Sequence, residues 1–206
     1  MIDSKLYKQI DGVSMGNPLG PTFANIFLAH LEKSFVNLPF SPKLYKRYID
    51  DTFCVFSNHD DCNSFFNHIN SVHPNLKFTM EKYTNGLAFL DTFVTVDDNN
   101  ICNTTIFRKP TFTGHILNFS SCCPTNFKVG LILGYLYRAF CVCSSWALFH
   151  LEVINITNIF INNGYPINFV QNIISKFVYS KFIVRIVPVK QSYTNSLTIL
   201  LWVIVR

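Results

Sequence analysis

Two adjacent carboxylates, Asp50 and Asp51, lie between apolar and aromatic runs in the stretch RYIDDTFCVF, which begins at Arg47. The flanks predict β-strands, because Tyr, Ile, Phe and Val suit a half-buried pleated surface. We therefore expect a hairpin with the two aspartates at its turn. The favoured two-residue turns contain glycine, whereas this pair adds charge repulsion. Turn chemistry alone does not explain it.

A tight turn that projects two carboxylates can hold hard divalent cations. Mg²⁺ prefers oxygen ligands and is often shared with substrate phosphates. Two such ions about 4 Å apart clamp the attacking and leaving oxygens of a phosphoryl transfer. The alternative is a solvated hairpin tip that binds no metal, and the pair by itself leaves that alternative open.

The elements around the hairpin predict an α+β fold. Residues 12–21 form a Gly/Pro loop, and a helix follows whose apolar face consists of Phe23, Ile26, Phe27, Leu31 and Phe35. A second helix is capped by Asp60 or Asp61 and has the apolar stripe Cys62, Phe65, Phe66, Ile69 and Val72. Strands at 76–83, 87–96 and 101–109 follow, which predicts a sheet with helices on one face.

The character of the chain changes after Pro110. Residues 126–180 are typical of helices, with a break at residues 162–164 and Pro166. We therefore divide the chain into residues 1–107, a helical region 108–185 and a C-terminal segment 186–206.

Composition limits the class of protein. The chain has 206 residues, of which 49% are hydrophobic and 14% charged, so it is neither disordered nor of low complexity. A net charge of +5 permits a polyanionic partner without requiring one. The seven cysteines form no CxxC pair, which favours free thiols over a zinc site. We find no signal peptide or transmembrane segment and expect an intracellular protein, in the nucleus or cytoplasm, with no membrane partner.

Several stretches, in order, resemble the palm of reverse transcriptases, and specifically that of Penelope-like retroelements. They are QIDGVSMGNPLGPTFANIFLAHLE, YKRYIDDTFCVF, LKFTME, LAFLDTFV and IFRKPTFTGHILNFSSCCPTNFKVGLILGYLYRAF. The resemblance covers roughly residues 7 to 190. It implies a partial polymerase palm followed by a helical, thumb-like region. It also implies RNA-directed DNA synthesis with an RNA template, a DNA primer and deoxynucleoside triphosphates, using two Mg²⁺ (or Mn²⁺) ions.

The resemblance assigns roles to particular residues. Asp50 and Asp51 are the metal ligands and catalytic residues, with Asp50 the principal ligand, and Tyr48 lies beside the primer terminus. The template and the incoming nucleotide are contacted by Gly12, Met15, Gly16, Pro18 and Leu19. Lys77 supplies a cation near the triphosphate, or is a solvated lysine at a strand edge.

Further assignments concern the nucleic-acid backbone. Arg108, Lys109 and Lys128 are expected to touch phosphates, or else to form a charged rim. Phe89 and Leu90 match a family hairpin segment and are expected in the core. The helices after residue 110 resemble a polymerase thumb, and a helix-turn-helix DNA reader is the alternative.

The chain departs from the family in one respect that matters for activity. Family polymerases carry another catalytic aspartate on a strand before the glycine loop, and residues 1–11 have no such strand pattern. We therefore expect a piece truncated at both ends, which lacks the fingers and nuclease regions and is inactive alone. The apolar run at 196–205, in the start of a connector, is expected to lack its partner. A non-catalytic nucleic-acid-binding remnant and a helix-turn-helix DNA-binding protein are the alternative functions.

Overall fold

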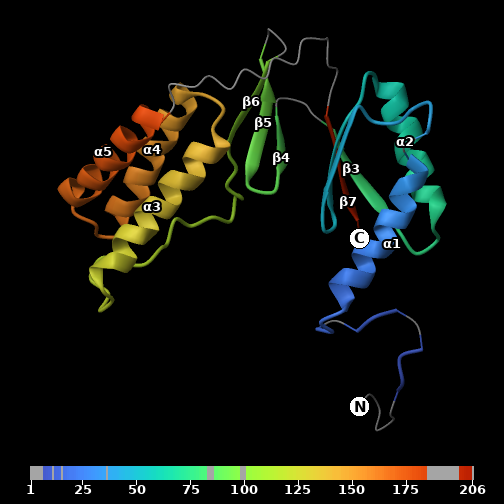
Figure 1. Cartoon of the computed structure of the whole chain (residues 1–206), viewed down its shortest axis with the longest axis horizontal. Coiled ribbons are helices and arrows are strands. Elements are labelled where there is room, and N and C mark those ends of the chain that lie inside the picture. Colours follow the sequence, from blue (N-terminus) through green and yellow to red (C-terminus); the bar gives the residue numbers. More distant parts are fainter. Residues whose placement is uncertain are drawn as a thin grey trace.

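A computed structural model describes residues 7–10, 12–14, 16–35, 37–82, 86–97, 101–184 and 200–205. Its helices are combined with small antiparallel sheets, so the predicted α+β class is confirmed. Figure 1 shows a three-helix unit on one side, a helix-and-sheet unit on the other, and a small sheet between them.

The helix-and-sheet unit begins with α1 (Gly20–Glu32), which continues into the short 3-10 helix η1 (Lys33–Phe35). The helix is where the sequence predicts it, but only part of its predicted apolar face is buried. Phe23, Ile26 and Phe27 are 51%, 61% and 42% exposed. Phe35 is buried in the core beneath the hairpin, because the C-terminal end of α1 is the part that packs there.

The predicted hairpin and second helix are confirmed. Strands β1 (Leu44–Tyr48) and β2 (Asp51–Val55) pair antiparallel, α2 (His59–Val72) follows, and β3 (Phe78–Lys82) comes next. Asn58 caps α2 by accepting a hydrogen bond from the Asp61 N–H, so the cap is not Asp60 or Asp61. The core beneath the hairpin consists of Phe35, Cys54, Phe56, Cys62, Phe65 and Ile69.

Strand β7 (Leu200–Val205) completes the first sheet, whose order is β1-β2-β7-β3 (Figure 1). It pairs antiparallel with β2 on one side and β3 on the other. The expectation that the C-terminal apolar run lacks a partner is therefore wrong. Its backbone groups are satisfied by strands about 120 to 150 residues earlier in the chain.

The second sheet has the order β4-β5-β6, from strands β4 (Leu87–Phe89), β5 (Thr92–Val96) and β6 (Cys102–Ile106). Residues 87–96 thus form a hairpin. Leu90 lies at its turn with a φ of 54° and is 38% exposed, so the expectation that it packs in the core is wrong. A cluster around Val55, Leu87 and Val94 joins the two sheets, and the rings of Phe53 and Phe89 lie 5.4 Å apart there.

The three-helix unit consists of α3 (Thr125–Val142), α4 (Trp146–Asn162) and α5 (Ile167–Val184). The break before Ile167 is where the sequence predicts it. The break at residues 143–145 is not predicted; Ser145 caps α4 by accepting from the Leu148 N–H at 3.2 Å. The helices share one core: Ile132, Leu136, Ala139, Cys143, Phe149, Ile156, Phe160, Tyr165, Val170 and Phe177.

Strand β6 fastens the helices to the second sheet. The Thr104 hydroxyl donates to the Val142 carbonyl at 2.6 Å, and the Thr104 N–H donates to the Ser144 hydroxyl at 3.1 Å. In the part of the chain that the structure describes, no helix combines the length and the apolar character needed to span a membrane.

Candidate nucleic-acid and metal site

The acidic hairpin ends in a tight turn. Tyr48 pairs with Asp51 across the strands, so Ile49 and Asp50 form the turn between them. Ile49 adopts a φ of 56°, a left-handed conformation that a β-branched residue rarely takes. Tyr48, Ile49 and Asp50 are exposed, while Asp51 is half-buried at the start of β2.

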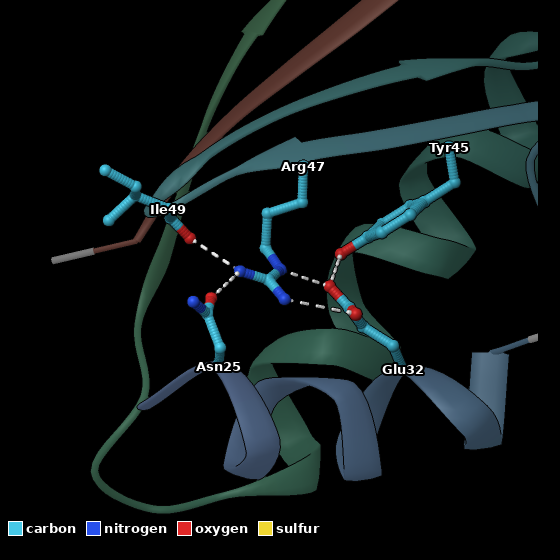
Figure 2. A network of polar contacts seen from close by, with 5 residues as sticks. All are labelled: Asn25, Glu32, Tyr45, Arg47 and Ile49. Carbon is cyan, nitrogen blue, oxygen red and sulfur yellow. Dashed lines mark hydrogen bonds and ion pairs between the residues drawn. The ribbon is translucent and has the colours of Figure 1, made fainter. Parts of the chain in front are cut away.

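A polar network ties this turn to α1 (Figure 2). The Arg47 guanidinium donates to both carboxylate oxygens of Glu32, and the Tyr45 hydroxyl donates to Glu32 Oε1 at 3.0 Å. Through Nη1, the same guanidinium donates to Asn25 Oδ1 and to the Ile49 carbonyl oxygen, each at 3.0 Å. Because Ile49 precedes Asp50 directly, Arg47 fixes the position of the acidic turn relative to α1.

One member of the network, the Tyr45 hydroxyl, does not titrate at ordinary pH. Burial and the neighbouring Glu32 carboxylate raise the pKa of Tyr45, so its hydroxyl stays protonated and keeps donating. The sequence did not predict these contacts. Arg47 lies 15 residues from Glu32 and 22 from Asn25, and no local pattern links them.

The glycine loop lies next to the same helix. Gly12 and Gly16 have φ values of 75° and 86°, which only glycine adopts without strain. The Gly20 N–H donates to the Asn17 carbonyl at 3.0 Å, and α1 starts there. Asn25, which touches Arg47, is five residues into the helix, about 7.5 Å along its axis. The loop thus ends where α1 begins, and the acidic turn is linked through Arg47 to the N-terminal half of the same helix.

The residues predicted to contact template and nucleotide are accessible. Gly12, Gly16, Pro18, Leu19 and Tyr48 are exposed. Lys77 is also exposed, directly before β3, as either of its two interpretations requires. Met15 lies outside the described residues. Contact of any of these residues with nucleic acid stays a prediction.

The electrostatics of the turn favour a nearby cation. Burial, and then the charge of Asp50, raise the pKa of Asp51. The Lys109 ammonium acts in the opposite direction and lowers it, which brings the segment after β6 within electrostatic reach of the turn. The folded protein therefore holds two carboxylates that repel each other and one lysine that partly compensates.

A second acidic doublet, Asp60 and Asp61, provides an internal comparison. It stands in the first turn of α2, where the helix dipole favours negative charge. The Asn58 amide donates to Asp61 Oδ2 at 2.8 Å, so its position has a structural explanation. The doublet at Asp50 has no such explanation, since a hairpin turn supplies no comparable field.

The acidic turn does not by itself complete a metal cage. Among the described residues, no group of three or more His, Cys, Asp or Glu side chains gathers where it could hold a metal ion. Two carboxylates are nevertheless a fitting donor set for Mg²⁺, which usually keeps several waters and shares substrate phosphates. Asp50 and Asp51 would be the protein ligands.

The three cations predicted to touch phosphates differ in availability. Lys109 is exposed. Arg108 is held by Glu152, with Nη1 2.9 Å from Oε2. Lys128 is only 9% exposed, and its amine donates to the Phe119 carbonyl at 2.6 Å. A phosphate contact from Lys128 would require that bond to break, so the structure does not favour the role predicted for it.

Helix α5 presents a polar face, which sequence reasoning did not single out. Between α4 and α5 lies a four-residue turn, 163–166, in which Gly164 has a φ of 82°. The buried Asn163 side chain holds this turn by donating to the Gly114 carbonyl at 2.8 Å. The exposed side chains along α5 include, together with the apolar Ile167 and Tyr179, amides, a hydroxyl and a cation: Asn168, Gln171, Asn172, Ser175 and Lys176.

Charge is divided unequally along the chain. Residues 1–107 hold 8 Lys and Arg against 11 Asp and Glu, whereas residues 108–206 hold 9 against the single acid Glu152. That one carboxylate is occupied by Arg108. The C-terminal half is therefore the half suited to a polyanion.

Residues 115–175 match the family described as the animal helix-turn-helix domain. The match spans α3, α4 and the first half of α5, and so includes the turn at 163–166. The comparison with curated proteins and the comparison with solved structures each found no match. The C-terminal half is thus similar to a helix-turn-helix domain, and the resemblance of the palm to reverse transcriptases stays a prediction.

Proposed function

We propose that this protein binds nucleic acid through its three-helix unit. The observation that carries the proposal is the similarity of residues 115–175 to an animal helix-turn-helix domain. In such motifs the second helix after a short, often glycine-containing turn enters the major groove. Here that arrangement is α4, the turn with Gly164, and α5.

The exposed chemistry of α5 supports its use as the contacting helix. Asn168 and Asn172 are four residues apart and so lie on one face of the helix, with Gln171 beside them. Asparagine and glutamine amides pair bidentately with adenine N6 and N7 in the major groove. Exposed apolar side chains occur on all three helices, since Phe127 on α3, Leu151 on α4 and Tyr179 on α5 are 67%, 58% and 72% exposed.

The test is selection of duplexes from a randomised pool, followed by affinity measurement. Asn172→Ala should weaken binding to the selected duplex by roughly 5- to 150-fold and relax the preference at one position. Asn158→Ala, which removes an exposed amide from α4, is the matched control and should change little. Two results would contradict the proposal that α5 recognises the base sequence. The wild-type protein could enrich no sequence from the pool, or Asn172→Ala could enrich the same sequences as wild type.

A second candidate function is that of a reverse transcriptase palm, and the acidic turn favours it. Asp50 stands at a strained hairpin turn and Asp51 directly after it, and Arg47 links this turn to α1, the helix that follows the glycine loop. Among the described residues, no hydrogen-bond partner accounts for the two carboxylates in the way that Asn58 accounts for Asp61. When bound, Mg²⁺ would supply neutralisation of triphosphate charge at this place.

The residues of the chain have distinct parts in this second proposal. Asp50 and Asp51 hold the cation, and Arg47 keeps the turn in position without touching the substrate. Tyr48 is 57% exposed next to the pair and can pack against the sugar or base of a primer terminus. Gly12 and Gly16 let the backbone approach a nucleotide closely, because they carry no side chain.

Cation binding can be tested apart from catalysis. Mn²⁺ is added with a deoxynucleoside triphosphate, and paramagnetic broadening of backbone amide resonances is followed. Broadening should centre on the acidic turn and disappear in Asp50→Asn, while Asp60→Asn leaves it unchanged. Broadening centred on α2, or spread equally over both doublets, would count against the palm proposal.

Activity is the further test of the palm proposal. We expect primer extension on an RNA template only when the strand that carries the upstream aspartate precedes the glycine loop. Asp50→Ala should abolish this extension. Synthesis that persists in that variant would remove the proposed catalytic role, whereas selective duplex binding without any synthesis would support the DNA-binding function alone.

A further inference from the structure

A cleft of about 310 Å³ lies between the β4–β5 turn, the segment that follows β6, and α3. In Figure 1 this segment runs between the small sheet and α3. The side chains that matter are Asp91, Arg108, Lys109, Phe112, Arg138 and Glu152. A volume of this size is at the lower end of the range for small-ligand sites.

The floor of the cleft is fixed. Glu152 is 6% exposed, and the Arg108 guanidinium pairs with both of its carboxylate oxygens. Arg108 also lies 5.7 Å from the centroid of the Phe112 ring, which gives that ring a cationic neighbour. Phe112 remains 42% exposed, so part of its surface is open for a second flat group.

The rim of the cleft can exchange partners. Arg138 Nη2 lies 2.6 Å from Asp91 Oδ2, but their side chains are 48% and 66% exposed. An ion pair this exposed contributes little to stability, so a phosphate can replace Asp91 as the partner of Arg138. Lys109 is exposed at the same cleft. Three cations therefore face two carboxylates, and one positive charge is in excess.

We propose that this cleft binds one nucleotide unit of a single-stranded nucleic acid, with its phosphate at Lys109 and Arg138 and its base against Phe112. Cationic grooves with aromatic stacking platforms are the usual means of binding single strands without sequence preference. The proposal rests on the nucleic-acid binding proposed above but uses a surface separate from α5.

The probe is a fluorescent oligothymidylate of about twelve nucleotides, with binding to the full chain followed by anisotropy at low salt. Phe112→Ala should weaken binding by about tenfold, since stacking on one aromatic ring stabilises a base by about 1–3 kcal/mol. Lys109→Gln should weaken it by about threefold or more and reduce its salt dependence. Both residues are exposed, and unchanged thermal melting will show that the variants fold.

Two controls separate this proposal from the preceding ones. Lys46→Gln removes an exposed cation on β1 and should leave oligothymidylate binding unchanged. Lys176→Gln, on α5, should weaken binding of a blunt duplex and spare the single strand, whereas Lys109→Gln should do the reverse. Three results would overturn the cleft proposal. They are a wild-type protein that does not bind the oligothymidylate, a Phe112→Ala variant that binds it as tightly as wild type, and a loss of affinity in Lys46→Gln equal to that in Lys109→Gln. If Lys176→Gln weakens duplex binding alone, that result supports the proposed duplex-binding function whatever the outcome at the cleft.

Discussion

At the scale of single residues, the acidic turn combines two unfavourable features. Ile49 occupies a left-handed conformation, and Asp51 is brought partly out of water beside Asp50. Strain and like charge at one place are typical of sites kept for function, because the rest of the fold must compensate for them. The hairpin could be predicted from the sequence, since aromatic and β-branched flanks define it locally, but its turn is Ile49 and Asp50 rather than the two aspartates, because Asp51 already pairs with Tyr48.

Replacing the strained residue should stabilise the hairpin. Ile49→Asn should raise the free energy of unfolding by about 1 kcal/mol, because asparagine tolerates the left-handed region far better than isoleucine. Urea unfolding of the two proteins measures the difference. Ile26→Asn, an equally exposed isoleucine within α1, should not stabilise the protein. Equal stability of wild type and Ile49→Asn would show that the turn is not strained.

The raised pKa of Asp51 has a definite consequence for pH dependence. The folded protein binds this proton more tightly than the unfolded chain does, so the contribution of Asp51 to stability is complete below pH 3.8. It is lost as the pH rises through the higher, folded-state pKa. Asp51→Asn should therefore stabilise the protein slightly at neutral pH, by less than about 1 kcal/mol because solvent screens the charges, and have no such effect at pH 3. Thermal unfolding at both pH values tests this, and a variant less stable than wild type at neutral pH would contradict it.

At the scale of elements, local patterns predicted helix α2 and the break between α4 and α5, because spacing and turn residues encode both. Pairing over long separations could not be predicted. The placement of β7 between β2 and β3 needs residues about 120 to 150 positions apart, and the Arg47 network joins separate elements. The sequence also did not predict the burial of the charged residue Lys128, whose amine donates a hydrogen bond to the Phe119 carbonyl.

The link between α1 and β1 should depend on Arg47. Arg47→Met leaves the Glu32 carboxylate, which is 23% exposed, without its ionic partner. A partly buried unpaired carboxylate should cost about 2 kcal/mol of unfolding free energy, less than for a fully buried one. Glu32→Gln with Arg47→Met should recover part of this loss in a double-mutant cycle. Additive effects in that cycle would show that the two side chains do not interact.

At the scale of the whole molecule, an acidic half that carries the hairpin is followed by a cationic half that carries the helices. Nine Lys and Arg residues against one Glu after residue 107 are an electrostatic footprint for a polyanion. The cleft at Phe112 lies where the two halves meet. The unequal charge of the two halves can be read from the sequence, and the fold shows that one half carries the hairpin and the other the three helices.

The most direct test of nucleic-acid binding is the salt dependence of duplex affinity for the full chain. Each phosphate contact releases counterions, so the observed binding constant should fall linearly with salt on logarithmic axes. Replacing Lys176 on α5 with glutamine should reduce that slope by about one, while Lys46→Gln on β1 leaves it unchanged. Absence of duplex binding at low salt, or the same slope in wild type and Lys176→Gln, would contradict a nucleic-acid interface on α5.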